Sequence, residues 1–331
     1  MSGGGWKGRT VLVTGAQGFV GSWLTERLMS EGASVVALRR DTPALSRFRT
    51  EGLEERCDVV MGDLLEYESA LRALNEHGVD TVFHLAAQTI VGTANRSPLS
   101  TFETNIRGTY TLLEAARAVG VVGGPQVRVV VASSDKAYGT HDELPYREEA
   151  PLLPRFPYDV SKAATDMIAR SYAYTFGLPV AVTRFANVYG GGDFNFSRIV
   201  PDTARALVQG ERPVVRSDGT PERDFLYVED AVDAYLAIAH SLEREELRGR
   251  AWNAGADEPH AVIDVVNRLV SISGKELEPD VQGQGTPHGE IDRQYLDSRA
   301  IREELGWEPQ WELDRGLAES YRWYEEHLPK R

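Results

Sequence analysis

The sequence has one cysteine, no apolar run long enough to cross a membrane, and fewer positive than negative charges. The single Cys57 excludes an intramolecular disulfide and favours a reducing compartment. Met1 is not followed by the hydrophobic stretch of a signal peptide, so we expect a cytoplasmic protein. A net charge of −14 argues against nucleic acid, which binds clustered lysines and arginines. We therefore predict no membrane or nucleic-acid partner, and no metal site.

What the sequence does contain is a regular alternation of strand-like and helical segments. A helical spacing over residues 21–32 is typical of the segments between the strands. This alternation predicts an α/β fold with a doubly wound parallel sheet, a Rossmann-type architecture. After residue 190 the elements become shorter, so we predict one domain over residues 8–190 and a smaller C-terminal lobe over 191–331, partly interleaved with the sheet. The predicted strands are 9–16, 33–40, 57–63, 79–87, 126–134 and 179–190.

The first chemical motif is a glycine-rich turn, "VTGAQGFVG", between the first strand and the first helix. Gly15, Gly18 and Gly21 would let backbone N–H groups approach a pyrophosphate at the positive end of the helix. The spacing is G-x-x-G-x-x-G, and alone it is also compatible with a tight strand–helix junction. Its position directly after the first strand favours a dinucleotide site.

Charged residues after the second strand bear on the choice between NAD and NADP. Arg39 and Arg40 favour the 2′-phosphate of NADP, whereas Asp41 leaves NAD open. Asp63, after the third strand, could accept a hydrogen bond from the adenine amino group or could cap the helix that follows it.

The second motif is "YDVSK", which sets Tyr158 and Lys162 one helical turn apart on the same face. A neighbouring ammonium lowers the pKa of a phenol, so we expect Lys162 to turn Tyr158 into a base for a sugar or alcohol hydroxyl. This spacing alone is common on helices and is weak evidence for catalysis. The other motifs of the chain strengthen the catalytic interpretation.

Taken in order, the motifs resemble one known family. "TGAQGFVG", "HLAA", "TNIRGT", "SSDKAYG", "YDVSK", "RFANVYGGGD" and "RDFLYVED" resemble the nucleotide-sugar epimerases and dehydratases of the extended short-chain dehydrogenase/reductase family. The resemblance covers nearly the whole chain. Within the family, "TGAQGFVGSWL", "SSDKAYG" and "GGGDFNFSRIVPD" are most similar to the CDP-glucose 4,6-dehydratase type.

This resemblance implies a tightly bound NAD or NADP that is recycled in each turnover. Tyr158 would take the proton of the sugar 4-hydroxyl while the cofactor takes the hydride, with Ser133 or Ser134 holding the oxygen. It further implies a nucleotide-diphosphate hexose as substrate and a homodimer. The cofactor would contact Gly15, Gln17, Gly18, Phe19, Val20, Gly21, Arg39, Arg40, Asp41, Asp63, Leu64, Leu85, Ala86, Ala87, Tyr158 and Lys162.

Asp135 and Lys136 decide which branch of the family fits. In a dehydratase, Asp135 would protonate the departing 6-hydroxyl, and Lys136 would remove the C5 proton where most dehydratases use Glu. The alternatives are a 4-epimerase, in which the two residues need another role, and an ion pair that only closes the strand end. A cofactor sensor without catalysis is a third reading, but it has no need of Ser134, Tyr158 and Lys162 together.

Recognition of the nucleotide diphosphate is expected in the second half of the chain. A protein of net charge −14 must concentrate arginines where it binds phosphate. By resemblance, Asn187 would contact the phosphate or sugar, Phe194 or Phe196 could stack on the base, and Asn105 would orient Lys162 through water. The candidate arginines are Arg198, Arg216, Arg223 and Arg293.

Overall fold

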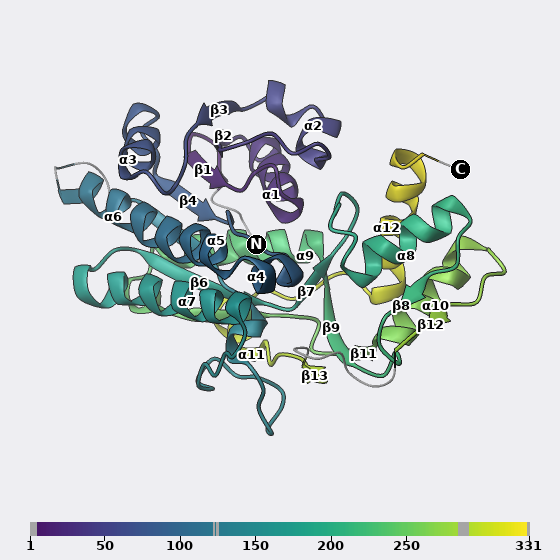
Figure 1. Cartoon of the computed structure of the whole chain (residues 1–331). Helices are drawn as coiled ribbons and strands as arrows, with labels where there is room; N and C mark the ends of the chain where they lie inside the picture. Colours follow the sequence, from purple (N-terminus) through teal and green to yellow (C-terminus); the bar gives the residue numbers. More distant parts are fainter. Residues whose placement is uncertain (1–4, 122, 124–125, 284–290, 330–331) are drawn as a thin grey trace.

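A computed structural model describes residues 5–121, 123, 126–283 and 291–329. Its centre is a seven-stranded sheet of order β10-β6-β5-β4-β1-β2-β3, with every neighbouring pair parallel (Figure 1). The predicted fold class is therefore confirmed. The strands are β1 (Thr10–Thr14), β2 (Ser34–Arg39), β3 (Asp58–Met61), β4 (Thr81–His84), β5 (Arg128–Ala132), β6 (Val180–Phe185) and β10 (Ala251–Ala254).

Helices cover both faces of this sheet, and the strands are apolar on both sides. In β1, Leu12 packs with the helices of one face, whereas Val11 and Val13 pack with those of the other. Side chains alternate along a strand, so a strand buried on both faces is a continuous apolar run. One face is covered by α3 (Tyr67–Glu76), α6 (Gly108–Val121) and α7 (Pro157–Phe176), the other by α1 (Phe19–Ser30), α9 (Val228–Ser241) and α11 (Arg299–Leu305).

Short helical segments connect these elements. They are α2 (Arg47–Thr50), η1 (Leu53–Glu55), α4 (Val91–Arg96), α5 (Pro98–Phe102), the π-helical turn η2 (Glu103–Arg107), η3 (Asp135–Tyr138) and η4 (Glu245–Leu247). Among the described residues, every helix is too short or too polar to span a lipid bilayer.

A smaller lobe lies beyond the carboxyl ends of the central strands (Figure 1). It contains a four-stranded sheet, a two-stranded sheet and three helices. Its elements are β7 (Asn187–Tyr189), β8 (Val214–Val215), β9 (Glu222–Tyr227), β11 (Pro259–Ala261), β12 (Asp280–Val281), β13 (Arg293–Gln294), α8 (Ile199–Gln209), α10 (Val262–Ser273) and α12 (Leu313–His327).

The predicted strand over 179–190 is two strands in two different sheets. The amide of Ala186 still donates to the Ala254 carbonyl of β10, at 3.0 Å. Beyond that residue β7 leaves the central sheet and pairs in parallel with β9. The break carries the chain from the central sheet into the lobe. The domain boundary at residue 190 stays a prediction; α9, β10 and α11, which follow it in sequence, belong to the central layers.

Candidate active site

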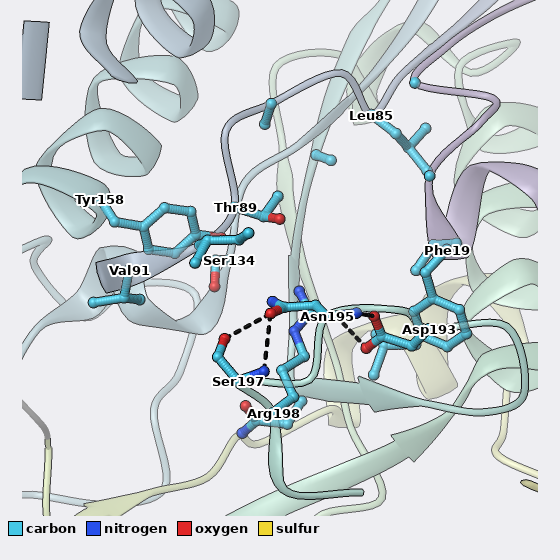
Figure 2. Close-up of a pocket in the computed structure, with 18 of the residues that line it drawn as sticks. Phe19, Leu85, Thr89, Val91, Ser134, Tyr158, Asp193, Asn195, Ser197 and Arg198 are labelled. Carbon is cyan, nitrogen blue, oxygen red and sulfur yellow. Dashed lines mark hydrogen bonds and ion pairs between the residues drawn. The ribbon is translucent and has the colours of Figure 1, made fainter. Parts of the chain in front are cut away.

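A cavity of about 1100 Å³ runs between the carboxyl edge of the central sheet and the lobe (Figure 2). It brings together most of the residues that the sequence predicts for the site. Arg39 and Arg293 are not in its lining. The predicted residues that line it are Gly15, Gln17, Gly18, Phe19, Val20, Gly21, Arg40, Asp41, Asp63, Leu64, Leu85, Ala86, Ala87, Ser133, Ser134, Asp135, Lys136, Tyr158, Lys162, Asn187, Arg198, Arg216 and Arg223.

The glycine turn at one end of the cavity has no room for side chains. Gly15 has φ 76°, and a Cβ atom there would lie 2.8 Å from the backbone nitrogen of Ala86. A Cβ on Gly21 would lie 2.1 Å from the Gly15 carbonyl oxygen. Gly18 forms the N-cap of α1, whose first turn has no acidic residue. This bare backbone at a helix N-terminus suits the pyrophosphate of a dinucleotide.

At the end of β2, the two arginines differ. Arg39 forms an ion pair with Glu54 and points out of the cavity lining. Arg40 and Asp41 both line the cavity, and they pair with each other at 2.8 Å. Asp63 does not cap the following helix, because Glu66 is the N-cap of α3; its carboxylate accepts instead from the Leu65 amide at 3.0 Å.

Tyr158, at the start of α7, faces the cavity beside Ser134 (Figure 2). The phenol is 8% exposed, and burial raises its pKa to about 12; the Arg198 guanidinium and a hydrogen bond with Ser134 act in the opposite direction. The Tyr158 pKa is therefore raised and not lowered as the sequence analysis expected. Lys162 donates to the Ala132 carbonyl at 2.7 Å, and burial lowers its own pKa to about 8.

Asp135 is a buried carboxylate at the start of η3. Its Oδ1 atom accepts from the Ser134 hydroxyl at 2.9 Å, but Oδ2 has no hydrogen-bond partner among the described residues. Burial raises the Asp135 pKa, although the charges of Lys136 and Arg223 oppose this. Because a raised pKa favours the protonated form, Asp135 is suited to donate a proton.

Lys136 is half-buried and lines the same cavity. Its ammonium forms no hydrogen bond or ion pair within the described part of the chain, and no ion pair joins it to Asp135. Asp135 and Lys136 therefore do not form, within the described residues, the simple ion pair that the sequence left as an alternative. Lys136 is left available for a group in the cavity.

A buried network behind η3 holds Asp135 and Lys136 in place. Arg184 on β6 forms a two-bond ion pair with Asp166 on α7, at 2.7 and 3.1 Å. The same guanidinium donates to the Tyr138 hydroxyl at 2.9 Å, and Tyr138 donates to Asn253 on β10 at 2.8 Å. The far end of η3 is thereby attached to a helix and two strands.

The two serines before η3 have different partners. Ser133 donates to the Lys162 carbonyl oxygen at 3.0 Å, which ties β5 to α7. Ser134 caps η3, accepting from the Lys136 amide at 3.2 Å, and bonds Tyr158. Of the two, Ser134 is the serine in position to contact an oxygen next to Tyr158.

The arginines expected to bind phosphate lie in unlike environments. Arg198 is held by Asp193 at 2.9 Å, and Arg216 by Asp202 at 3.2 Å, where its side chain is 61% exposed. Arg223 is buried and donates to the carbonyls of Glu222 and Asp292. Arg293 pairs with Glu222 at 2.7 Å on the outer surface.

The remaining candidates contact protein groups. Asn187 lines the cavity and lies 3.4 Å from the Asp224 carbonyl oxygen. Phe194 lines the cavity and packs edge-on against Phe196, their ring centroids 6.3 Å apart. Asn105 bonds the backbone of Gln88 and the Ser161 hydroxyl, so it connects the segment after β4 to α7; its orientation of Lys162 through water stays a prediction.

Two residues near the site were missed by the sequence analysis. His84 is buried between Thr14 at 2.8 Å and Thr109 at 2.9 Å, and burial lowers its pKa to about 3, so the ring is neutral. It connects β1, β4 and α6 beneath the cofactor end. Asp193, which holds Arg198, follows three consecutive glycines, and that run was the available signal.

Comparisons with known proteins agree with this geometry. Residues 12–320 match the family described as GDP-mannose 4,6 dehydratase. The CDP-glucose 4,6-dehydratase of Salmonella typhimurium is 30% identical, over 96% of this chain and 91% of that protein.

Two solved structures are also similar. The dTDP-glucose 4,6-dehydratase of Streptomyces venezuelae, with NAD and TYD bound, has a TM-score of 0.84 and 31% identity, over 96% of this chain and 97% of its own. The UDP-glucose 4-epimerase of Thermotoga maritima, with UDP-glucose, has a TM-score of 0.87 and 29% identity, over 97% of this chain and all of its own.

The buried ammonium of Lys162 generates a stability prediction. Lys162→Met should raise the free energy of unfolding at pH 7 by up to about 3 kcal/mol, because a folded pKa of about 8 lies below the ordinary 10.5. Between these two pH values the unfolded chain binds more protons than the folded one, so the parent protein gains stability as the pH rises and the advantage of the variant shrinks.

Urea unfolding of cofactor-free protein at pH 7 and pH 10 measures this difference. Lys7→Met, at an exposed lysine, is the control and should change little at either pH. A Lys162→Met variant that is equally destabilised at both pH values would contradict the prediction.

Proposed function

The chain belongs to the family described as GDP-mannose 4,6 dehydratase, and from this premise we propose that it is a nucleotide-sugar 4,6-dehydratase. It converts a nucleotide-diphosphate hexose of the CDP-glucose type into the 4-keto-6-deoxyhexose. The observation that carries the proposal is the buried Asp135 carboxyl, one oxygen of which has no partner among the described residues, beside the available Lys136.

Each of these side chains has a part in the reaction. Tyr158 accepts the proton of the 4-hydroxyl, and Ser134 holds that oxygen. The glycine turn and Lys162 would hold NAD or NADP, which would supply a hydride acceptor for C4 and a hydride donor for C6. Lys136 removes the C5 proton, which the 4-ketone makes acidic, while Asp135 protonates the departing 6-hydroxyl. Lys136 then returns a proton to C5 when hydride reaches C6. The raised pKa of Asp135 supports this last role.

A 4-epimerase is the second candidate, and the likeness to the Thermotoga maritima epimerase favours it. An epimerase needs Tyr158 and the cofactor but no acid for a 6-hydroxyl. The buried carboxyl of Asp135 is then without a chemical role, although burying such a group costs free energy. This cost favours the dehydratase.

Recognition of the nucleotide diphosphate is assigned to the lobe end of the cavity. Arg198, Arg216 and Arg223 line it, and guanidinium groups bind phosphate oxygens in pairs. Asn187 also lines the cavity and would contact the phosphate or the sugar. Arg293 has no part in the proposal, because it pairs with Glu222 outside the cavity lining.

We propose NAD as the cofactor. Arg39, one of the two arginines that favour NADP, is engaged by Glu54 away from the cavity. Asp41 lines the cavity, where its carboxylate would accept from a ribose hydroxyl of NAD. Lys162 and the glycine turn would hold the rest of the dinucleotide.

We also propose a homodimer formed through α6 and α7. These two helices pack side by side (Figure 1). Four of their large apolar side chains are exposed to solvent. A second copy of the same surface would bury them, and α7 continues from this surface to Tyr158. The exposed fractions are 43% for Tyr110, 70% for Val121, 63% for Met167 and 66% for Tyr174.

The direct test of the function is a substrate panel. The purified protein, with NAD or NADP, is incubated with CDP-, dTDP-, GDP- and UDP-hexoses in deuterated water. We expect loss of one water from a CDP-hexose, with deuterium at C5, and faster turnover with NAD. An isobaric product inverted at C4 would establish the epimerase instead. Mass spectrometry and proton NMR distinguish the two.

Two variants separate the acid from the base. Asp135→Asn should still exchange the C5 proton of oxidised sugar with deuterium but should lose water at least about 100-fold more slowly. Lys136→Met should reduce the cofactor yet show neither exchange nor water loss. NMR of the recovered sugar measures exchange, with Lys7→Met as control. If Lys136→Met exchanges at the parent rate, Lys136 is not the base.

The dimer has its own test. Met167→Glu should shift the chain from dimer to monomer at micromolar concentration, since it buries a charge in the proposed interface. Light scattering after size exclusion gives the mass. Val281→Glu, at an exposed apolar residue of β12, is the control and should stay dimeric. A monomeric parent protein would overturn the proposal.

A further inference from the structure

Three consecutive glycines, Gly190–Gly192, connect β7 to the substrate end of the cavity, and we call them the glycine strap. Each is enclosed by a side chain from a different element. A Cβ atom would lie 2.5 Å from Val228 at Gly190, 2.4 Å from Trp323 at Gly191 and 2.6 Å from Arg47 at Gly192. The strap therefore has no room for a side chain at any of its three positions.

Arg47 forms one wall of the strap, and it is itself firmly held. It is 5% exposed, and its guanidinium lies 3.9 Å above the centre of the Trp23 ring. Glu26 accepts from it at 2.6 Å. The Trp23 indole in turn donates to the Gly191 carbonyl at 2.9 Å. Arg47 and Trp23 thus join α2 and α1 to the strap.

The C-terminal helix α12 forms the opposite wall. The Trp323 indole donates to Glu51 at 3.2 Å, which connects α12 to the segment after α2. The Tyr324 hydroxyl lies 2.8 Å from the carbonyl oxygen of Asp193 and 3.2 Å from that of Gly190. Segments from both ends of the chain therefore fix the strap and the residue that follows it.

The strap leads directly to a charged pair at the active site. Asp193 is 3% exposed; its carboxylate accepts from Arg198 at 2.9 Å and from the Asn195 amide at 2.9 Å. Figure 2 shows Arg198 next to Asp193 and Asn195, in the lining of the same cavity as Tyr158. Arg198 is also the largest charge that favours the Tyr158 phenolate.

We propose that Arg47 is a positioning residue for the proposed dehydratase reaction, acting through the glycine strap to hold Asp193 and Arg198 opposite Tyr158. The residue before it, Ser46, donates to the Gln17 carbonyl of the cofactor turn at 2.8 Å. Ser46 and Arg47 thus align the cofactor half and the substrate half of the cavity, because one contacts the cofactor turn and the other the glycine strap. The proposal rests on the proposed function for its kinetic readout only.

The test compares Arg47→Ala with Arg47→Met. Alanine removes the stem that packs on Gly192, whereas methionine keeps a stem of similar length. For Arg47→Ala we expect a KM for the nucleotide sugar about tenfold higher, because a displaced loop misplaces its ligands. In the pH dependence of kcat, the pKa of the acid limb should rise by roughly half a unit, because a displaced Arg198 no longer stabilises the Tyr158 phenolate.

The KM of Arg47→Met should stay within about threefold of that of the parent protein. The acid limb should not shift, and the bound cofactor content should be the same. A merely structural role of Arg47 would lower the melting temperature without moving the acid limb. An Arg47→Ala variant with normal KM and an unshifted acid limb overturns the proposal.

A second pair of variants covers the case in which Arg47→Ala fails to fold. Gly190→Ala introduces a methyl group against Val228, and Gly190→Ala with Val228→Ala removes the contact at 2.5 Å. The single variant should reproduce the raised KM and shifted acid limb, and the double variant should largely restore both.

Hydrogen exchange of the backbone amides that follow the strap tests its positioning role without requiring turnover. In Gly190→Ala, the Asn195 and Ser197 amides should exchange faster, because their acceptors, the side chains of Asp193 and Asn195, are displaced. The double variant should slow this exchange again, and unchanged exchange in the single variant overturns the proposal. A parent protein that dehydrates no nucleotide sugar overturns the proposed function instead, and the exchange result still decides the role of the strap.

Discussion

The site depends on a buried ion pair between Arg184 and Asp166, which are 1% and 0% exposed. Two charges removed from water are tolerated only where their geometry is good and their other donors are satisfied. Here both conditions hold, because the remaining donors of Arg184 reach the Tyr138 hydroxyl and the Glu148 carbonyl. The pair joins β6 to α7 and, through Tyr138, secures the end of η3. The turn η3 and the helix that carries Tyr158 therefore share one buried support.

The sequence was sufficient for the features that depend on neighbouring residues. Apolar runs separated by helical spacing predicted the parallel sheet, since strands buried on both faces lack polar alternation. The glycine turn was predicted from its three glycines. The structure explains the need for glycine, because a Cβ at Gly15 or Gly21 would clash with nearby backbone atoms. Tyr158 and Lys162 share a helix face by spacing alone. Each of these depends on a short stretch of chain.

Features that depend on distant partners were not predicted. The sequence does not reveal that Glu54 engages Arg39, or that the chain changes sheets after Ala186. The Tyr158 pKa moved opposite to expectation because the low polarity of the buried site outweighs the favourable charges near the phenol. Burial at a site assembled from several elements is a property of the whole fold, and no local motif encodes it.

The same reasoning explains why dehydratases and epimerases share an architecture. In the proposed reaction, oxidation at C4 needs only Tyr158, Ser134 and the cofactor turn, and a 4-epimerase reaction would need the same groups. Elimination of water further needs a proton donor, and a carboxyl can donate only if its surroundings keep it protonated. Burial of Asp135 raises its pKa and so favours the protonated form, although the charges of Lys136 and Arg223 act in the opposite direction. Under the proposed function, the distinction between the two reactions lies in the solvation of the turn that contains Asp135, not in the arrangement of helices and strands.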